Sequence, residues 1–227
     1  MPDIVSTPLR IELEAGDSVS ALLSEPANPM AGYVFAHGAG AGMNHRFMED
    51  VAQGLAERGV ATLRYQFPYM EKGSKRPDTP RVAHAAVRAA VDAAARRWPQ
   101  LPLFAGGKSF GGRMSSQAQA ATPLPGVRGL VFFGFPLHPA GKPGTERAEH
   151  LLQVACPMLF LQGTRDELAE TMLLRGLIEQ LGERATLELV DDADHSFHVP
   201  ARSGRTDAQV RAGVLDAFVR WVGQRTP

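Results

Sequence analysis

Residues 107–111 read Gly-Lys-Ser-Phe-Gly and place a serine between two glycines. In the G-x-S-x-G pattern, a tight turn from a strand into a helix lifts the serine hydroxyl above the edge of a sheet. The strand-like run Leu101–Ala105 and the helix-like run Phe110–Ala121 supply that context here. Glycines flank the serine because the tight turn leaves no room for larger side chains. The pattern therefore predicts that Ser109 is a nucleophile.

A serine hydroxyl is a weak nucleophile and needs a base, which in turn needs an acid to orient it. In proteins with this turn, the acid and then the histidine follow the serine along the chain. Asp166 follows an apolar strand and the turn residues Gly-Thr-Arg at 163–165. His195 lies in a loop between the last predicted strand and the last predicted helix. We therefore predict that His195 is the base and Asp166 the acid.

Other residues near His195 are alternatives for both roles. His198 lies three residues further on, and we favour His195 because it follows the strand sooner. Asp194 is adjacent to His195, and adjacent side chains usually project in different directions. Asp191 and Asp192 lie where the strand breaks into a turn, and aspartates there commonly bind the local backbone.

A tetrahedral intermediate on Ser109 needs hydrogen-bond donors for its oxyanion. We predict that the backbone N–H of Phe110 is one donor. The second should come from the loop after the strand Gly32–Ala36, with Ala39 as first choice and Gly40 as second. Loop residues at the same edge of the sheet are predicted to bind the substrate: Gly38, Phe67, Tyr69 and His138. For His138, a structural role is an equal alternative.

Basic residues near the serine permit two interpretations. Lys108 and Arg113 flank the turn, and we expect them to pair with loop carboxylates; the alternative is binding an anionic group of the substrate. The polar segment 66–80 follows a strand and is predicted to be a loop that borders the site, or else a solvated connection. The cations of this segment are Lys72, Lys75 and Arg76. They would attract substrates that bear a carboxylate.

Two nucleotide-binding motifs fail on spacing. A P-loop that ends at Lys108 and Ser109 needs a glycine at position 102, which is proline. A dinucleotide-binding turn that begins at Gly38 would place its third glycine at Met43. The His, Cys, Asp and Glu residues also lack the spacing of a metal site. We therefore expect no metal and no other cofactor.

Strand-like and helix-like segments alternate along the chain, which predicts an α/β fold with a mostly parallel sheet and helices on both faces. Arg10–Leu13 and Ser18–Ser24, around the turn at 15–17, predict an N-terminal antiparallel hairpin. The connection between the strands Val127–Phe133 and Pro157–Gln162 is short and rich in proline, which leaves no room for a cap domain. We expect residues 1–227 to form a single domain. The predicted helices are Arg46–Arg58, Val82–Arg97, Phe110–Ala121, Glu167–Leu181 and Asp207–Gln224.

Composition limits the classes of partner and the compartment. The chain has 24 basic and 24 acidic residues, so its formal charge is zero, whereas a nucleic-acid-binding protein usually carries a basic excess. No apolar run approaches the ~18 residues of a membrane span. The charged N-terminal segment indicates no secretory signal. The single cysteine, Cys156, excludes an internal disulfide. We predict a cytoplasmic protein with a small-molecule partner and neither a nucleic-acid nor a membrane partner.

Five motifs together resemble the dienelactone-hydrolase-like branch of the α/β-hydrolase superfamily. Within that branch, the chain is most similar to small bacterial hydrolases related to the hydrolase-like domain of a subunit of the nonspecific-lethal acetyltransferase complex. The motifs are His-Gly-Ala-Gly at 37–40, Phe-Pro-Tyr-Met at 67–70, Gly-Lys-Ser-Phe-Gly-Gly-Arg at 107–113, Gly-Thr-Arg-Asp at 163–166 and Asp-His-Ser-Phe at 194–197.

The resemblance implies an α/β-hydrolase fold and a serine esterase or related acyl hydrolase. Dienelactone hydrolase itself uses a cysteine nucleophile, so its substrate is not carried over to Ser109. Our leading hypothesis is an enzyme that hydrolyses a carboxylic ester or thioester through an acyl-serine intermediate. The alternative is a non-catalytic scaffold or binding module that retains the fold, because members of the chromatin-associated branch can serve as scaffolds.

Overall fold

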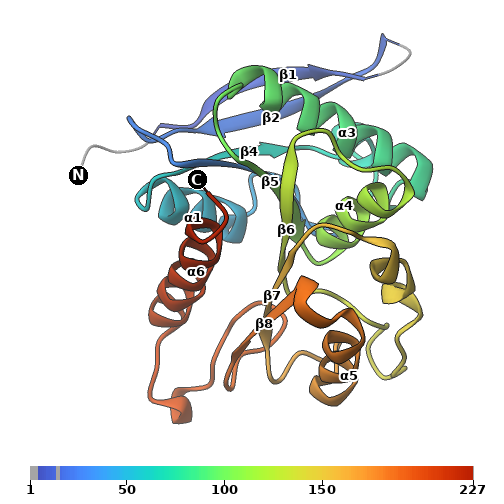
Figure 1. Ribbon diagram of the computed structural model, residues 1–227, viewed down its shortest axis with the longest axis vertical. Coiled ribbons are helices and arrows are strands. Elements are labelled where there is room, and N and C mark those ends of the chain that lie inside the picture. Colours follow the sequence, from blue (N-terminus) through green and yellow to red (C-terminus); the bar gives the residue numbers. More distant parts are fainter. Residues whose placement is uncertain (1–4, 14–15, 227) are drawn as a thin grey trace.

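A computed structural model describes residues 5–13 and 16–226. These residues form an eight-stranded sheet in the order β1-β2-β4-β3-β5-β6-β7-β8 (Figure 1). The strands from β3 to β8 pair in parallel, and β1 and β2 form an antiparallel hairpin that also pairs antiparallel with β4. The strands are β1 (Thr7–Glu12), β2 (Ser18–Ser24), β3 (Ala31–Ala36), β4 (Val60–Tyr65), β5 (Leu103–Lys108), β6 (Val127–Phe133), β7 (Met158–Gly163) and β8 (Ala185–Val190). The predicted sheet and hairpin are confirmed, although Ala15 of the predicted turn lies outside the described residues.

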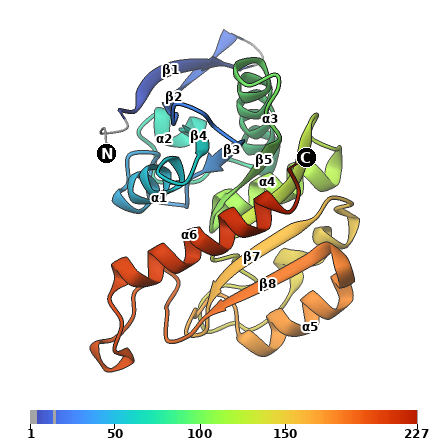
Figure 2. The ribbon, with the colours of Figure 1, turned by 60° about the vertical axis from the view of Figure 1, so that its left-hand side comes forward.

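Helices cover both faces of this sheet. On one face lie α1 and α6, and on the other lie α3, α4 and α5 (Figures 1 and 2). The helices are α1 (Arg46–Ala56), α2 (Pro68–Glu71), α3 (Pro80–Arg97), α4 (Phe110–Ala121), α5 (Thr171–Leu181) and α6 (Asp207–Gly223), with short 3-10 helices η2 (Glu146–Gln153), η3 (Gly182–Arg184) and η4 (Ala201–Ser203). None of the helices in the described chain is long and apolar enough to cross a membrane.

Each face of the sheet carries its own apolar core. Alternate residues of a strand point to opposite faces, so the neighbours Phe132 and Phe133 of β6 enter different cores. Phe133 packs near Phe35 and Phe218, and Phe132 packs near Phe160. Because both faces are covered, the central strands read as continuous apolar runs. This packing holds the carboxyl ends of the parallel strands in fixed positions along one edge.

The structure corrects two of the predictions for these segments. The helix predicted from Glu167 begins at Thr171, because the side chain of Asp166 accepts the backbone N–H of Leu168 and keeps the preceding residues in a turn. The segment 66–80, predicted to be a loop, contains α2. The connection 134–157 between β6 and β7 contains η2 and no inserted cap domain, as its length predicted.

Candidate active site

Ser109 occupies a strained turn between β5 and α4. Its φ of 50° and ψ of −114° lie outside the regions that non-glycine residues usually adopt. A Cβ at Gly107 or Gly111 would lie 2.3 or 2.4 Å from the carbonyl oxygen of Ala36, so both positions require glycine. The Ser109 N–H donates to the Phe133 carbonyl at 3.1 Å, which ties the turn to β6. The predicted turn is therefore present, and Ser109 lies at the carboxyl edge of the sheet.

Asp166 and His195 come together behind this turn. The His195 Nδ1 lies 2.7 Å from Asp166 Oδ2. The Asp166 side chain is fully buried, and it also accepts the amide of Gln162 at 2.5 Å and the N–H of Leu168 at 2.8 Å. These three donors fix the carboxylate in one orientation. A carboxylate on Nδ1 in turn fixes the plane of the imidazole and places the proton on that nitrogen.

The loop that carries His195 is held against the turn that carries Asp166. Arg165 donates its backbone N–H to the carbonyl of Ala193 at 2.9 Å. A Cβ at Gly163 would lie only 2.3 Å from the same carbonyl oxygen, so glycine is needed for this close approach. Two residues that are distant in sequence therefore meet because their backbones are tied together, and not because their loops are flexible.

Lys108 supports the same loop from the other side. Its ammonium donates to the backbone carbonyl of His195 and lies 5.7 Å from the ring centres of both Phe47 and Phe197. Burial lowers the pKa of Lys108 to about 8, although the charges of Asp166 and Asp194 raise it. The ion pair that we expected with a loop carboxylate is not formed by Lys108, nor by Arg113, within the described residues.

The alternatives for the base and the acid have other partners. His198 is exposed and lies 2.9 Å from Asp207, which raises the pKa of this histidine. Asp194 accepts the backbone N–H groups of Ser196 and His198 at 2.7 and 3.0 Å, so its carboxylate braces the loop. The geometry brings His195 and Asp166 together and leaves these alternatives outside the pair.

Two of the predicted oxyanion donors, Ala39 and Phe110, line the same cavity as Ser109. Within the described chain, the backbone N–H groups of Ala39 and Phe110 donate to no protein acceptor. The N–H of Gly40 donates to the Tyr69 hydroxyl at 3.4 Å. Among the described residues, the Ala39 N–H is therefore left without a protein acceptor, whereas the Gly40 N–H has one.

His37 anchors this donor loop, a role that the sequence analysis missed. Its Nε2 accepts the backbone N–H of Phe67 at 3.0 Å, so the ring proton lies on Nδ1, which donates to the Gly38 carbonyl at 2.8 Å. Burial lowers the pKa of His37 to about 4 and keeps the ring neutral. The adjacent glycines indicate a functional loop in the sequence, but only the fold shows that the His37 ring contacts the backbone of Phe67.

Two cavities meet at Ser109. The first has a volume of about 600 Å³ and is lined by Phe47, Lys108, His195 and Phe197 among others. The second has a volume of about 360 Å³ and is lined by Phe110, Pro136, Arg113 and Arg147 among others. Both cavities include Ala39, Ser109 and Leu168 in their walls. A bound molecule can therefore lie across Ser109 with one part in each cavity.

Of the four predicted substrate-binding residues, the structure places only Gly38 in the wall of these two cavities. Phe67 is fully buried against the rings of His37 and Phe110. Tyr69 is also buried and supports the Gly40 N–H. His138 is buried, and its Nε2 accepts the backbone N–H of Glu170 at 3.3 Å. These three side chains lie behind the walls and hold them in place.

A family model described as an alpha/beta hydrolase domain matches residues 29–223. The chain belongs to the alpha/beta hydrolase family. Solved structures match over nearly their whole length: dienelactone hydrolase from Anabaena variabilis (20% identity, 99% of this chain and 100% of that chain, TM-score 0.79) and an alpha-beta serine hydrolase homologue from Coxiella burnetii (21%, 93% and 96%, 0.75). A serine hydrolase without a lid from Xanthomonas campestris also matches (22%, 95% and 94%, 0.75). The resemblance predicted from the motifs is confirmed in its family and its fold.

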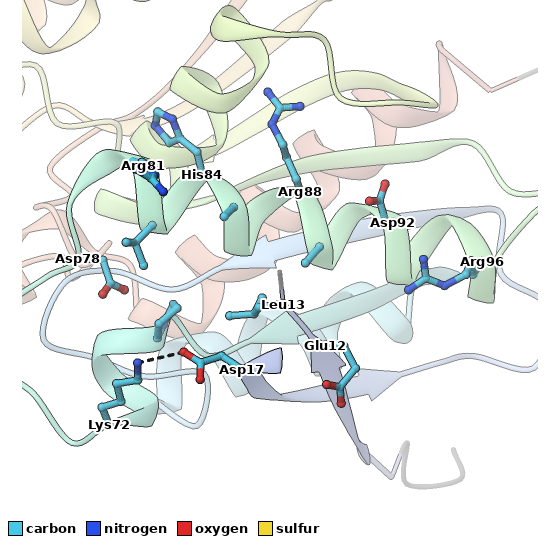
Figure 3. Close-up of a pocket in the computed structure, with 14 residues that line it drawn as sticks. Glu12, Leu13, Asp17, Lys72, Asp78, Arg81, His84, Arg88, Asp92 and Arg96 are labelled. Atoms are coloured by element: carbon cyan, nitrogen blue, oxygen red, sulfur yellow. Dashed lines mark hydrogen bonds and ion pairs between the residues drawn. The ribbon is translucent and has the colours of Figure 1, made fainter. Parts of the chain in front are cut away.

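This alpha/beta hydrolase also has a larger groove, of about 970 Å³, along α3 and away from Ser109. Figure 3 shows its charged lining, including Lys72 paired with Asp17 at 3.2 Å. Lys72 therefore faces this groove and not the cavities at Ser109, and neither Lys75 nor Arg76 lines those cavities. The 66–80 segment does border the second cavity, through Pro77, Asp78 and Pro80, but its basic side chains do not form the expected rim. In the described part of the chain, no group of three His, Cys, Asp or Glu residues could hold a metal ion.

Proposed function

We propose that this alpha/beta hydrolase cleaves a carboxylic ester or thioester through an acyl-serine intermediate. Ser109 is the nucleophile, His195 the general base and Asp166 the acid that orients it. The observation that supports this most strongly is the 2.7 Å contact between His195 Nδ1 and the fully buried Asp166, directly behind a strained serine turn. A scaffold has no need of this arrangement together with unpaired N–H groups beside the serine.

Catalysis follows from the positions of the protons. The proton on Nδ1 leaves Nε2 of His195 free to accept the Ser109 proton as the hydroxyl attacks the ester carbonyl. The oxyanion then accepts hydrogen bonds from the N–H groups of Ala39 and Phe110. Imidazolium His195 returns its proton to the leaving alcohol or thiol, and a water molecule, activated by the same histidine, releases the acid. In the described chain the Ser109 hydroxyl makes no hydrogen bond to His195, and such contacts often shorten only when substrate binds.

The shape of the site favours small substrates. The β6–β7 connection contributes a 3-10 helix where a cap could be inserted, so the cavities at Ser109 open directly at the sheet edge. The apolar rings of Phe47 and Phe197 line the first cavity. We therefore propose a substrate of modest size with an apolar leaving group.

The test combines activity with covalent labelling. Wild-type protein should hydrolyse p-nitrophenyl acetate and react with a fluorophosphonate probe at Ser109, as mapped by peptide mass spectrometry. Ser109→Ala should lose labelling and at least ~10³-fold in kcat, because the covalent route is lost while the fold is retained. Wild-type protein that neither labels nor turns over any ester of a short-chain panel would support the scaffold alternative instead.

A further inference from the structure

Two arginines enter the second cavity from different elements. Arg113 lies on α4, one helical turn after Ser109, and its backbone N–H donates to the Ser109 carbonyl at 3.1 Å. Arg147 lies on η2, and both side chains line the 360 Å³ cavity that includes Ser109 in its wall. Both arginines line the same small cavity, and burial, together with the positive charge of Arg147, lowers the pKa of Arg113.

Neither arginine has a counter-charge in the described chain. No ion pair and no hydrogen bond to a protein acceptor involves either guanidinium, and Nε of Arg113 is buried without a partner. His150 adds no third positive charge, because burial and the charge of Arg113 lower its pKa to about 4. Two like charges in a partly buried site repel each other and lose hydration, and a bound anion would relieve both costs.

One carboxylate, that of Asp78, also lines the second cavity, but it has other partners. Its Oδ2 accepts the backbone N–H of Tyr69 at 2.9 Å, and the charge that acts on it is that of Lys72. Among the described residues, Asp78 forms no ion pair or hydrogen bond with Arg113. The arginine pair therefore remains a positive patch one helical turn from the serine.

The position of His195 decides which part of an ester reaches that patch. His195 must protonate the leaving group, and it lines the first cavity and not the second. The leaving group therefore occupies the first cavity, beside the rings of Phe47 and Phe197. The acyl part extends from Ser109 into the second cavity, toward Arg113 and Arg147.

We propose, on the basis of the function above, that Arg113 and Arg147 bind a carboxylate on the acyl part of the substrate. The substrates are then half-esters of short dicarboxylic acids, and hydrolysis with one water molecule releases a dicarboxylate and an alcohol. Guanidinium groups suit this ligand because their planar donors match the two oxygens of a carboxylate. The first cavity, with the rings of Phe47 and Phe197 in its wall, receives the uncharged alcohol part.

The kinetic test compares isosteric substrates. We would measure kcat/KM for the p-nitrophenyl half-esters of glutaric and adipic acid and for analogues in which a carboxamide replaces the free carboxylate. Wild-type protein should prefer the acid by about tenfold or more, the factor expected of one charge-assisted hydrogen bond. Arg113→Gln and Arg147→Gln should each reduce that ratio toward one. Arg76→Gln removes an exposed cation that lines neither cavity and should keep the wild-type ratio.

A binding measurement separates this inference from the proposed function. Glutarate dianion should raise the Tm of wild-type protein and of Arg76→Gln, but not of Arg113→Gln or Arg147→Gln, whether or not the protein turns over esters. Protein that hydrolyses p-nitrophenyl acetate but shows an acid-to-amide ratio near one, or accepts neither half-ester, would overturn the inference and leave the proposed function intact. If one arginine variant fails to fold, as judged by its melting transition, the other carries the same test.

Discussion

Replacing Asp166 with asparagine exchanges one carboxylate oxygen for an NH₂ group and leaves the side-chain volume almost unchanged, so it isolates the charge and the proton position. In the wild-type protein, Oδ2 accepts from both His195 Nδ1 and the Gln162 amide, and Oδ1 accepts the Leu168 N–H. With its NH₂ in the Oδ2 position, asparagine would face the two donors of His195 and Gln162 with a third donor. In the opposite orientation, the NH₂ would lie in the Oδ1 position and face the Leu168 N–H, again donor against donor. No rotamer restores all three hydrogen bonds.

The expected cost follows from the tautomer and from the lost charge. In the first orientation, the NH₂ beside Nδ1 favours the imidazole with its proton on Nε2, which cannot accept the Ser109 proton. Loss of the carboxylate also removes the charge that stabilises the imidazolium. We expect kcat for p-nitrophenyl acetate to fall by ~10²- to 10⁴-fold, which corresponds to about 3–5 kcal/mol of transition-state stabilisation. KM should change little, because Asp166 is buried behind His195 and lines neither cavity.

Asp194→Asn provides the matched control. The Oδ1 atom of Asp194 accepts two backbone N–H groups, and an asparagine carbonyl oxygen can accept both. We expect this variant to keep kcat within a few-fold of wild type, as we do Asp192→Asn, and the melting transition of each variant should be measured in parallel. A fully active Asp166→Asn variant beside an inactive, folded Asp194→Asn variant would refute the assignment of the acid.

Three further outcomes are expected. Lys108→Met should lower kcat by about ten- to 100-fold, because the His195 carbonyl loses its hydrogen bond to the Lys108 ammonium. This is the range expected for loss of a hydrogen bond from a charged donor. A wild-type kcat would show that the loop keeps its position without Lys108. Burial lowers the pKa of His37 and His150 from 6.5 to about 4, so below pH 6.5 the unfolded chain binds protons that the folded chain does not. Urea unfolding should therefore show stability falling as the pH drops toward 4, by up to about 3 kcal/mol for each histidine, with a smaller loss in His150→Gln; stability independent of pH in that range would contradict the burial of these rings. Short-chain p-nitrophenyl esters should be hydrolysed faster than long-chain ones, and rates that rise steadily with chain length would argue against the small, uncapped site.

The features that sequence could predict are those set by local backbone geometry or by chain order. The turn at Ser109 needs glycines at fixed positions, and the structure shows why, since a Cβ at Gly107 or Gly111 would strike the Ala36 carbonyl. The order of serine, aspartate and histidine follows from the order of the strands, and it identified Asp166 and His195 as the pair that the fold brings together.

The features that sequence could not predict depend on where a side chain points in the folded chain. Phe67, Tyr69 and His138 follow strands at the correct edge, but they turn into the core and support the walls. Asp166 shortens the helix that follows it through a side-chain contact that helical periodicity does not reveal. Arg113 forms no ion pair with a carboxylate in the described chain, and η2 places Arg147 in the wall of the same cavity, which depends on tertiary structure alone.

The central claim is that Ser109 carries the acyl group during turnover. Acid quenching of the protein in mid-reaction with p-nitrophenyl acetate, followed by intact and peptide mass spectrometry, tests it directly. Asp166→Asn should form the acetyl adduct more slowly than wild type, and Ser109→Ala should form none. We predict a mass increase of one acetyl group located on Ser109. An acetyl group found reproducibly on another residue, with turnover intact in Ser109→Ala, would contradict the account.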